Sequence, residues 1–137
     1  MIAGMGMDVV ALERFRVLTQ PGPGAVHSRF VEATFTAEEL RYCREQAHGD
    51  AAEHLAARFA AKEATLKALD AACAAGGVDP STVQLSHVEV RRDLRGRPSL
   101  ALSGGARALF EQLRLSAAHV SLSHDGDVVA ATVILER

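Results

Sequence analysis

The stretch RFAAKEATLKAL, Arg58 to Leu69, lies in the longest helical pattern of the chain and places charges where a helix should be apolar. At about 100° per residue, the large apolar side chains of this region fall on one arc: Leu55, Phe59, Leu66, Leu69 and Cys73. Lys62 falls inside the arc and Glu63 at its edge. Lys67 is one turn beyond Glu63 on the same side, because residues four apart are neighbours on a helix. Core packing alone does not explain these charges.

The rest of the chain is a mixture of short strands and helices around this long helix, which we expect over residues 51–75, before Gly76 and Gly77. Strict βαβ alternation is absent, so the fold class is α+β rather than a doubly wound parallel sheet. The patterns predict strands over 2–10 and 83–91, a short strand after a turn at 95–98, a break at PGPG (21–24) and a terminal hairpin around Asp125 and Gly126. They also predict helices over 11–19, 26–33, 36–47 and 103–113, the third of them opened by a capping box of Thr36 and Glu39.

The bulk composition limits the function classes. A length of 137 residues with 48% hydrophobic residues suits one domain. A net charge of -2 and few aromatic residues argue against a nucleic-acid partner. Cys43 and Cys73 form no CxxC pair, which fits buried thiols in a reducing compartment. No basic leader or bilayer-length apolar run is present, so we expect a cytoplasmic protein without a membrane partner.

Two acids far apart in the chain are candidates for one site. Asp8 follows a Gly-x-Gly stretch at a strand end, and packing the long helix on that strand would bring Glu63 towards it. Two clustered carboxylates repel unless a divalent cation lies between them, and hard oxygen ligands suit Mg²⁺. The alternative is that Glu63 is a solvated residue at the helix edge and Asp8 a turn or cap acid. GMGMD without a third glycine is a weak dinucleotide motif, so a Rossmann fold is not indicated.

The lysines strengthen the case for phosphate chemistry, because a Mg²⁺ phosphate site also uses ammonium groups as point charges. The alternatives are that Lys62 snorkels to water and that Lys67 is an ion-pair partner of Glu63. His124, in SLSHDG, is either a site residue or a turn histidine bonded to backbone. No histidine spacing predicts zinc, and no GxSxG motif predicts a serine nucleophile.

Three motifs in order, GMGMD (4–8), RFAAKEATLKAL (58–69) and SLSHD (121–125), resemble the holo-acyl-carrier-protein synthases, the short class of 4′-phosphopantetheinyl transferases. The resemblance spans almost the whole chain, including the RGRP turn, the early LERF stretch and the final hairpin. It implies one domain over 1–137, with an antiparallel sheet packed against a long helix. It also implies an enzyme, typically a homotrimer with active sites between subunits, that transfers 4′-phosphopantetheine from coenzyme A to a serine of apo-acyl carrier protein and releases adenosine 3′,5′-bisphosphate.

The resemblance also implies residue roles. Asp8 and Glu63 would bind Mg²⁺, which in the family also holds the pyrophosphate of coenzyme A. Lys62 and Lys67 would lie near the phosphates of coenzyme A, and Asp8, Glu63 and Lys67 would be the catalytic residues. Whether Glu63 itself or a metal-bound water accepts the serine proton is left open.

Three further positions match family positions at the edge of the site. Arg58 and His124 correspond to residues that approach the adenosine and its 3′-phosphate, and Arg14 to a basic position that grips the acidic carrier protein. Part of the charged face of the long helix would then look into a cleft shared between subunits rather than into a core.

Two features depart from the family pattern. The stretch DAACAAGGVDP (70–80) prolongs the long helix where the family commonly has a glycine-rich loop, and PGPG follows the first helix. Two other functions stay open: a non-catalytic homologue that binds coenzyme A or carrier protein, and an unrelated Mg²⁺-dependent nucleotide hydrolase. The carrier protein, of fatty-acid or polyketide synthesis, is not indicated by the sequence.

Overall fold

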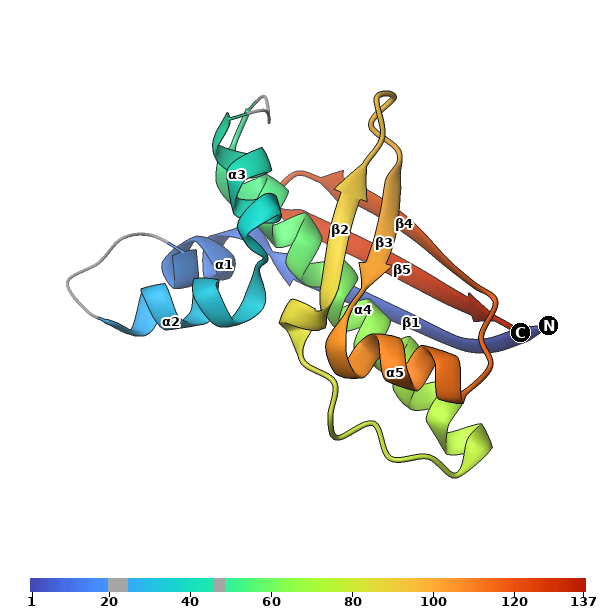
Figure 1. Cartoon of the computed structure of the whole chain (residues 1–137). Helices are drawn as coiled ribbons and strands as arrows, with labels where there is room; N and C mark the ends of the chain where they lie inside the picture. The colour runs from blue at the N-terminus through green and yellow to red at the C-terminus, as the bar shows by residue number, and fades with distance from the viewer. Residues whose placement is uncertain (20–24, 46–48) are drawn as a thin grey trace.

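The computed structural model describes residues 1–19, 25–45 and 49–137. The predicted α+β class is confirmed, and Figure 1 shows one long helix between two sheets. The predicted break at 21–24 and the predicted end of the third helix near residue 47 lie outside the described residues. In chain order, the elements are β1 (Ile2–Ala11), α1 (Leu12–Thr19), α2 (Ala25–Thr34), α3 (Ala37–Glu45), α4 (Ala51–Gly76), a 3₁₀ turn η1 (Leu85–His87), β2 (Val88–Arg92), β3 (Pro98–Leu102), α5 (Gly104–Gln112), β4 (Ala117–Asp125) and β5 (Val128–Glu136).

The larger sheet is antiparallel, in the order β1-β5-β4, and α4 crosses one of its faces (Figure 1). The predicted terminal hairpin supplies β4 and β5, with Gly126 at φ +56 in its turn. Alternate residues of β5 point at the helix and are buried, which is the pattern of a sheet with one covered face: Val129, Ala131, Val133 and Leu135.

Two glycines allow β1 to lie directly against α4. A Cβ on Gly4 would be 2.1 Å from the Ala68 carbonyl oxygen, and one on Gly6 would be 2.0 Å from that of Ala64. The facing helix residues are alanines with no exposed surface, so backbone packs nearly on backbone. Because side chains alternate along a strand, Asp8 lies on the same face as the two glycines and points towards α4. The Gly-x-Gly spacing therefore serves helix packing here.

Helix α4 is closed at both ends by its own sequence. The Asp50 side chain accepts a hydrogen bond from the Ala52 amide, and Gly77 adopts φ +65, which suits a left-handed C-cap. Its most buried stripe consists of alanines. The predicted apolar arc is only partly in the core, because Leu69 and Cys73 are buried while Leu55, Phe59 and Leu66 pack at its margin. The helix is therefore enclosed on more than one side.

The smaller sheet, β2-β3, lies on another side of α4. The strand predicted over 83–91 begins only at Val88, because residues 85–87 form the 3₁₀ turn. The His87 ring accepts a hydrogen bond from the Gln84 amide at 3.1 Å, which closes that turn. Val88 and Val90 then point into the core.

An aromatic cluster anchors α1 to α4. The Phe15 ring centroid lies 5.6 Å from that of Phe59, 6.2 Å from that of Phe30 and 6.4 Å from that of Phe35. Aromatic pairs in this range stabilise packing beyond their buried area. Arg14, the residue before Phe15, is thereby held at the surface beside β1. No helix in the described ranges is long and apolar enough to cross a bilayer.

Candidate active site

The two acids predicted to meet do lie together. Asp8 comes from the helix-facing side of β1 and Glu63 from the flank of α4, and both line one open pocket of about 260 Å³. The Asp8 side chain is 17% exposed, and Glu63 is partly buried. Arg14, Phe15 and Phe59 line the same pocket. The pairing depends on the close contact of β1 with α4.

The electrostatics of this pocket favour binding of a cation. Burial raises the pKa of Glu63, the nearby negative charge of Asp8 raises it further, and Lys67 acts in the opposite direction. The Lys67 ammonium donates to Asp8 Oδ1 at 2.8 Å and to the Met7 carbonyl oxygen at 3.0 Å. This hydrogen bond to Asp8 is the main cause of the raised pKa of Lys67. The Lys67 ammonium is therefore paired with Asp8, and it offsets the charge of Glu63 only in part.

The donor set fits a magnesium site that shares its ligands with a substrate. Mg²⁺ is commonly bound by one or two carboxylates, with water and phosphate oxygens completing the octahedron. Asp8 and Glu63 supply two carboxylates at the mouth of an open pocket. Among the described residues, no group of three or more His, Cys, Asp or Glu side chains forms a complete metal cage. Asp8 and Glu63 would thus supply two oxygen-bearing groups of an octahedral ligand set.

Lys62 requires a correction to the expectation that the charged helix face opens into a cleft. Its side chain is 0% exposed and lies in the core, 2.6 Å from Glu39 Oε1. The same ammonium donates to the carbonyl oxygens of Leu85 and Val88. Burial lowers the pKa of Lys62, and the Glu39 carboxylate opposes this shift. In the single chain, Lys62 therefore has no surface with which to reach a phosphate of coenzyme A.

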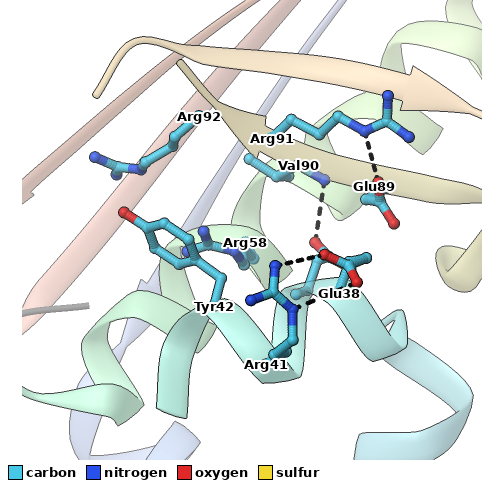
Figure 2. Close-up of a pocket in the computed structure, with 9 residues that line it drawn as sticks. Glu38, Arg41, Tyr42, Arg58, Glu89, Val90, Arg91 and Arg92 are labelled. Atoms are coloured by element: carbon cyan, nitrogen blue, oxygen red, sulfur yellow. Dashed lines mark hydrogen bonds and ion pairs between the residues drawn. The ribbon is translucent and has the colours of Figure 1, made fainter. Parts of the chain in front are cut away.

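Arg58 lines a second pocket, of about 320 Å³, on the side of α4 that faces α3 and β2. Figure 2 shows Tyr42 from α3, Arg58 from α4 and Arg92 from β2 around the same hollow. The Arg58 guanidinium lies 4.6 Å from the Tyr42 ring centroid and donates to the His54 carbonyl oxygen at 3.1 Å. Its Nε is buried and has no hydrogen-bond partner among the described residues. A buried cation with a spare donor suits an anionic ligand.

His124 lies apart from both pockets, near the end of β4. Its Nδ1 is 3.6 Å from Glu53 Oε1 on α4, and its side chain is 67% exposed. The structure thus brings Asp8, Glu63, Lys67 and Arg14 together, and places Arg58 and His124 at two other positions along α4.

Sequence reasoning missed three residues that shape these sites: Glu39, Tyr42 and Arg92. Glu39 was assigned only to the capping box with Thr36, which the structure contains, with the Thr36 amide 3.0 Å from Glu39 Oε1 and the Glu39 amide 3.2 Å from Thr36 Oγ1. The available signal was Lys62 itself, since a lysine inside an apolar arc needs a buried acid.

The fold and the site define a class of protein: a small α+β protein in which a strand acid and a helix acid meet beside a lysine. The family model described as "4′-phosphopantetheinyl transferase superfamily" matches residues 4–133. The chain therefore belongs to the 4′-phosphopantetheinyl transferase superfamily.

Individual relatives agree with this assignment. A holo-[acyl-carrier-protein] synthase of Geobacter metallireducens is 43% identical over 137 residues, covering 100% of this chain and 99% of the relative. The crystal structure of a Neisseria meningitidis holo-[acyl-carrier-protein] synthase superposes with a TM-score of 0.78 at 28% identity, over 100% of both chains. The Bacillus anthracis synthase, solved in complex with CoA, gives 0.71 at 30% identity, over 99% of this chain and 97% of that chain. The predicted resemblance, and with it the prediction of an enzyme, is confirmed.

Proposed function

We propose that this chain transfers 4′-phosphopantetheine from coenzyme A to a serine of an apo-acyl carrier protein, in a Mg²⁺-dependent reaction that releases adenosine 3′,5′-bisphosphate. The observation that carries the proposal is the meeting of Asp8 and Glu63, from distant parts of the chain, beside Lys67 in one open pocket. A protein that only bound coenzyme A would have no need of two carboxylates next to its pyrophosphate, because they repel it.

The reaction needs alignment and charge neutralisation more than covalent help from the protein. The serine oxygen forms a bond to the phosphorus that carries the pantetheine arm. The bond from that phosphorus to the bridging oxygen breaks, and its electron pair leaves with adenosine 3′,5′-bisphosphate. A Mg²⁺ ion held by Asp8 and Glu63 would supply charge neutralisation at the pyrophosphate.

The chain's own side chains then have separate tasks. Lys67, which is 53% exposed and sits on Asp8, can turn its ammonium to the phosphate oxygens as negative charge develops. The Glu63 carboxylate, partly buried beside Asp8 in this pocket, would take the serine proton, either directly or through a metal-bound water. Phe59 and Phe15 keep one wall of the pocket apolar.

Coenzyme A would extend from this pocket along α4. Arg58 offers a buried guanidinium with an unused donor, and the Tyr42 ring beside it offers an aromatic face. These groups suit the 3′-phosphate and the adenine. His124 is exposed on β4, where it could serve the site of a neighbouring subunit.

A homotrimer with shared sites is part of the proposal, and the uncovered face of the larger sheet supports it. Along β1, Met5, Met7 and Val9 point away from α4 and are 63%, 56% and 56% exposed. Ile134 of β5 lies opposite Met5 on the same outer face. An exposed apolar patch of this kind usually marks an interface, and the occupant we infer is another copy of the chain. Light scattering of the purified protein tests this: a monomeric mass at micromolar concentration would reject it.

One experiment tests the transferase proposal. An apo-acyl carrier protein is mixed with coenzyme A, Mg²⁺ and the chain, and its mass is followed by mass spectrometry. We expect a gain equal to one phosphopantetheine group, abolished by EDTA and restored by excess Mg²⁺. Binding of coenzyme A without any gain on fatty-acid or polyketide carrier proteins would select the non-catalytic alternative. Cleavage of coenzyme A without carrier modification would select a hydrolase.

A further inference from the structure

We propose that Lys62 acts on the reaction from inside the core, as a positioning residue: its ion pair with Glu39 fixes the rotation of α4 that points Glu63 at Asp8. This inference rests on the proposed function, in which Asp8 and Glu63 together hold Mg²⁺. It assigns Lys62 a different task from contact with the phosphates of coenzyme A.

The first step is that the hydrogen-bonding capacity of Lys62 is used up inside the protein. An ammonium has three N–H donors. In Lys62 they meet Glu39 Oε1 at 2.6 Å, the Leu85 carbonyl oxygen at 3.2 Å and the Val88 carbonyl oxygen. With no exposed surface and no spare donor, Lys62 acts on its surroundings only through these three partners and the Phe35 ring, whose centroid lies 5.7 Å from the ammonium.

The second step is that the acid partner is anchored just as fully. Glu39 is 1% exposed. Its Oε1 accepts from the Thr36 amide at 3.0 Å as well as from Lys62, and its Oε2 accepts from the Val90 amide at 3.1 Å. The pair therefore ties the middle of α4 to the start of α3, to η1 and to β2. Three separate segments hold one point on the helix.

The third step concerns the opposite side of α4. On the side of the helix that carries Glu63, Lys62 and Ala64 project about 200° apart, and Glu63 projects midway, about 100° from each. Ala64 is held against Gly6 so closely that no Cβ fits between them. The helix is thus held on two nearly opposite sides, by the Lys62–Glu39 ion pair and by the contact of Ala64 with Gly6. Glu63 lies on the side between these two contacts. Together the two contacts determine where the Glu63 carboxylate points.

The fourth step is the size of the effect. A carboxylate lies about 6 Å from the helix axis, so a rotation of about 20° moves it by about 2 Å. Mg²⁺ accepts little deviation from octahedral geometry, and a misplacement of about 1 Å in a reacting site can lower the rate about 100-fold. A small loss of rotational control would therefore separate Glu63 from Asp8 as a ligand pair.

The test compares the whole protein with Lys62→Met, Glu39→Gln and the double variant, using Mn²⁺ alone as the probe, followed by isothermal titration or paramagnetic resonance. Glu45→Gln, the same change at an exposed position of α3, is the matched control. Affinity for adenosine 3′,5′-bisphosphate without divalent cation, kcat and KM for coenzyme A, and the thermal midpoint are measured alongside.

We expect each single variant to weaken Mn²⁺ binding and lower kcat by about 10-fold or more. The affinity for adenosine 3′,5′-bisphosphate should stay within about twofold of that of the unaltered protein. The double variant should lose no more Mn²⁺ affinity and kcat than the more impaired single variant, because the two residues act as one unit. Glu45→Gln should change nothing. If Lys62→Met does not fold, Glu39→Gln carries the test, since a neutral amide still fills the same volume.

Other outcomes would overturn the inference. Weaker adenosine 3′,5′-bisphosphate binding in Lys62→Met, with unchanged Mn²⁺ affinity, would mean direct phosphate contact. A lower thermal midpoint alone, with Mn²⁺ affinity and kcat unchanged, would mean a purely structural pair, and absence of Mn²⁺ binding by the unaltered protein would remove the site. By contrast, an unaltered protein that binds Mn²⁺ but modifies no carrier protein would reject only the transferase proposal, and the Mn²⁺ measurements would still decide the role of Lys62.

Discussion

Lys62 and Glu63 are adjacent in the chain, and the fold treats their charges in opposite ways. Lys62 is buried with an acid and two carbonyl oxygens around it, so each of its three N–H donors has a partner. Glu63 is half-buried beside a second acid, Asp8, so its charge is only partly matched. Within RFAAKEATLKAL they are the one pair of adjacent charged residues. One helix turn thus combines a charge that stabilises the scaffold with a charge kept available for chemistry.

The difference shows what a buried charge means in each setting. A fully matched buried pair is costly to break from one side, because the remaining partner is left uncompensated. An incompletely matched acid near a surface lowers stability slightly, but it provides affinity for a cation. Substitutions at Lys62 should therefore lower the free energy of unfolding as well as the metal affinity, whereas substitutions at Glu63 should lower activity without loss of stability.

The largest expected effect is on stability at the buried pair. Lys62→Met should lower the free energy of unfolding by about 3–5 kcal/mol, because Glu39 stays buried without its cation. Lys67→Met is the matched control, and since a surface ion pair contributes at most about 1 kcal/mol, its loss should be small. Urea unfolding followed by circular dichroism measures both. If Lys62→Met and Lys67→Met lowered the free energy of unfolding equally, the buried ion pair would contribute no more to stability than the surface one.

The opposite pattern is expected at Glu63. Glu63→Gln keeps the shape of the side chain but removes a candidate metal ligand, so kcat should fall about 100- to 1,000-fold while the thermal midpoint is kept or raised. Asp70→Asn, at an exposed acid further along α4, is the control and should transfer normally. Mass-spectrometric initial rates would decide, and near-normal transfer by Glu63→Gln would reject the metal assignment.

Gly6→Ala tests the contact that brings the two acids together. The added Cβ would meet the Ala64 carbonyl oxygen at 2.0 Å, so β1 must move away from α4. Overpacking of this kind costs about 1–3 kcal/mol, and the displaced Asp8 should also weaken Mn²⁺ binding. Gly126→Asn, in the open hairpin turn, is the comparison, because no atom lies near its Cβ position. Unchanged Mn²⁺ affinity in Gly6→Ala would show that the glycine contact does not align the acids.

A smaller effect is expected at the rim of the pocket. Arg14 is exposed and lines the pocket of Asp8 and Glu63, so Arg14→Ala should raise KM for carrier protein about 3- to 10-fold at low salt and leave kcat nearly unchanged. The effect should shrink as salt screens the encounter. Arg107→Ala on α5 controls for loss of a surface charge. A salt-independent change in KM would argue against an electrostatic role.

The smallest effect concerns pH and stability without divalent cations. Burial and the charge of Asp8 raise the pKa of Glu63 in the folded protein, so the folded state holds this proton more tightly than the unfolded chain does. Stability should therefore fall as pH rises from the ordinary glutamate value through the raised one. The difference in thermal midpoint between Glu63→Gln and the unaltered protein should grow across this range. A constant difference would mean that Glu63 titrates normally.

Much of the fold followed from local patterns. The boundaries of β1, α1 and α4 lie within one residue of the predicted ones, since glycines and capping residues act over a few positions. The capping box at Thr36 was predicted for the same reason. The strand at 83–91 was predicted too early, because the His87 ring closes a 3₁₀ turn and nothing in its alternation revealed this.

The site was accessible to sequence reasoning only in part. Asp8 and Glu63 could be paired from the sequence. Asp8 follows Gly-x-Gly at a strand end and Glu63 lies at the edge of the core-facing arc of the long helix, so packing that helix on the strand brings the two acids together. The partner of Lys62 could not be found, because Glu39 is 23 positions away and its capping role already seemed to account for it. The pocket around Arg58, with Tyr42 and Arg92, needs three elements to converge and leaves no local pattern.

The sequence by itself determined the α+β class, the long helix with its caps, and the chemical types of the residues that gather at Asp8. Only the tertiary structure decided which charges of α4 are enclosed and which stay open. Neighbouring residues on a helix point about 100° apart, so the surroundings of each are set by whichever element packs on that side. For Lys62 that element carries an acid, and for Glu63 it is the strand that brings Asp8.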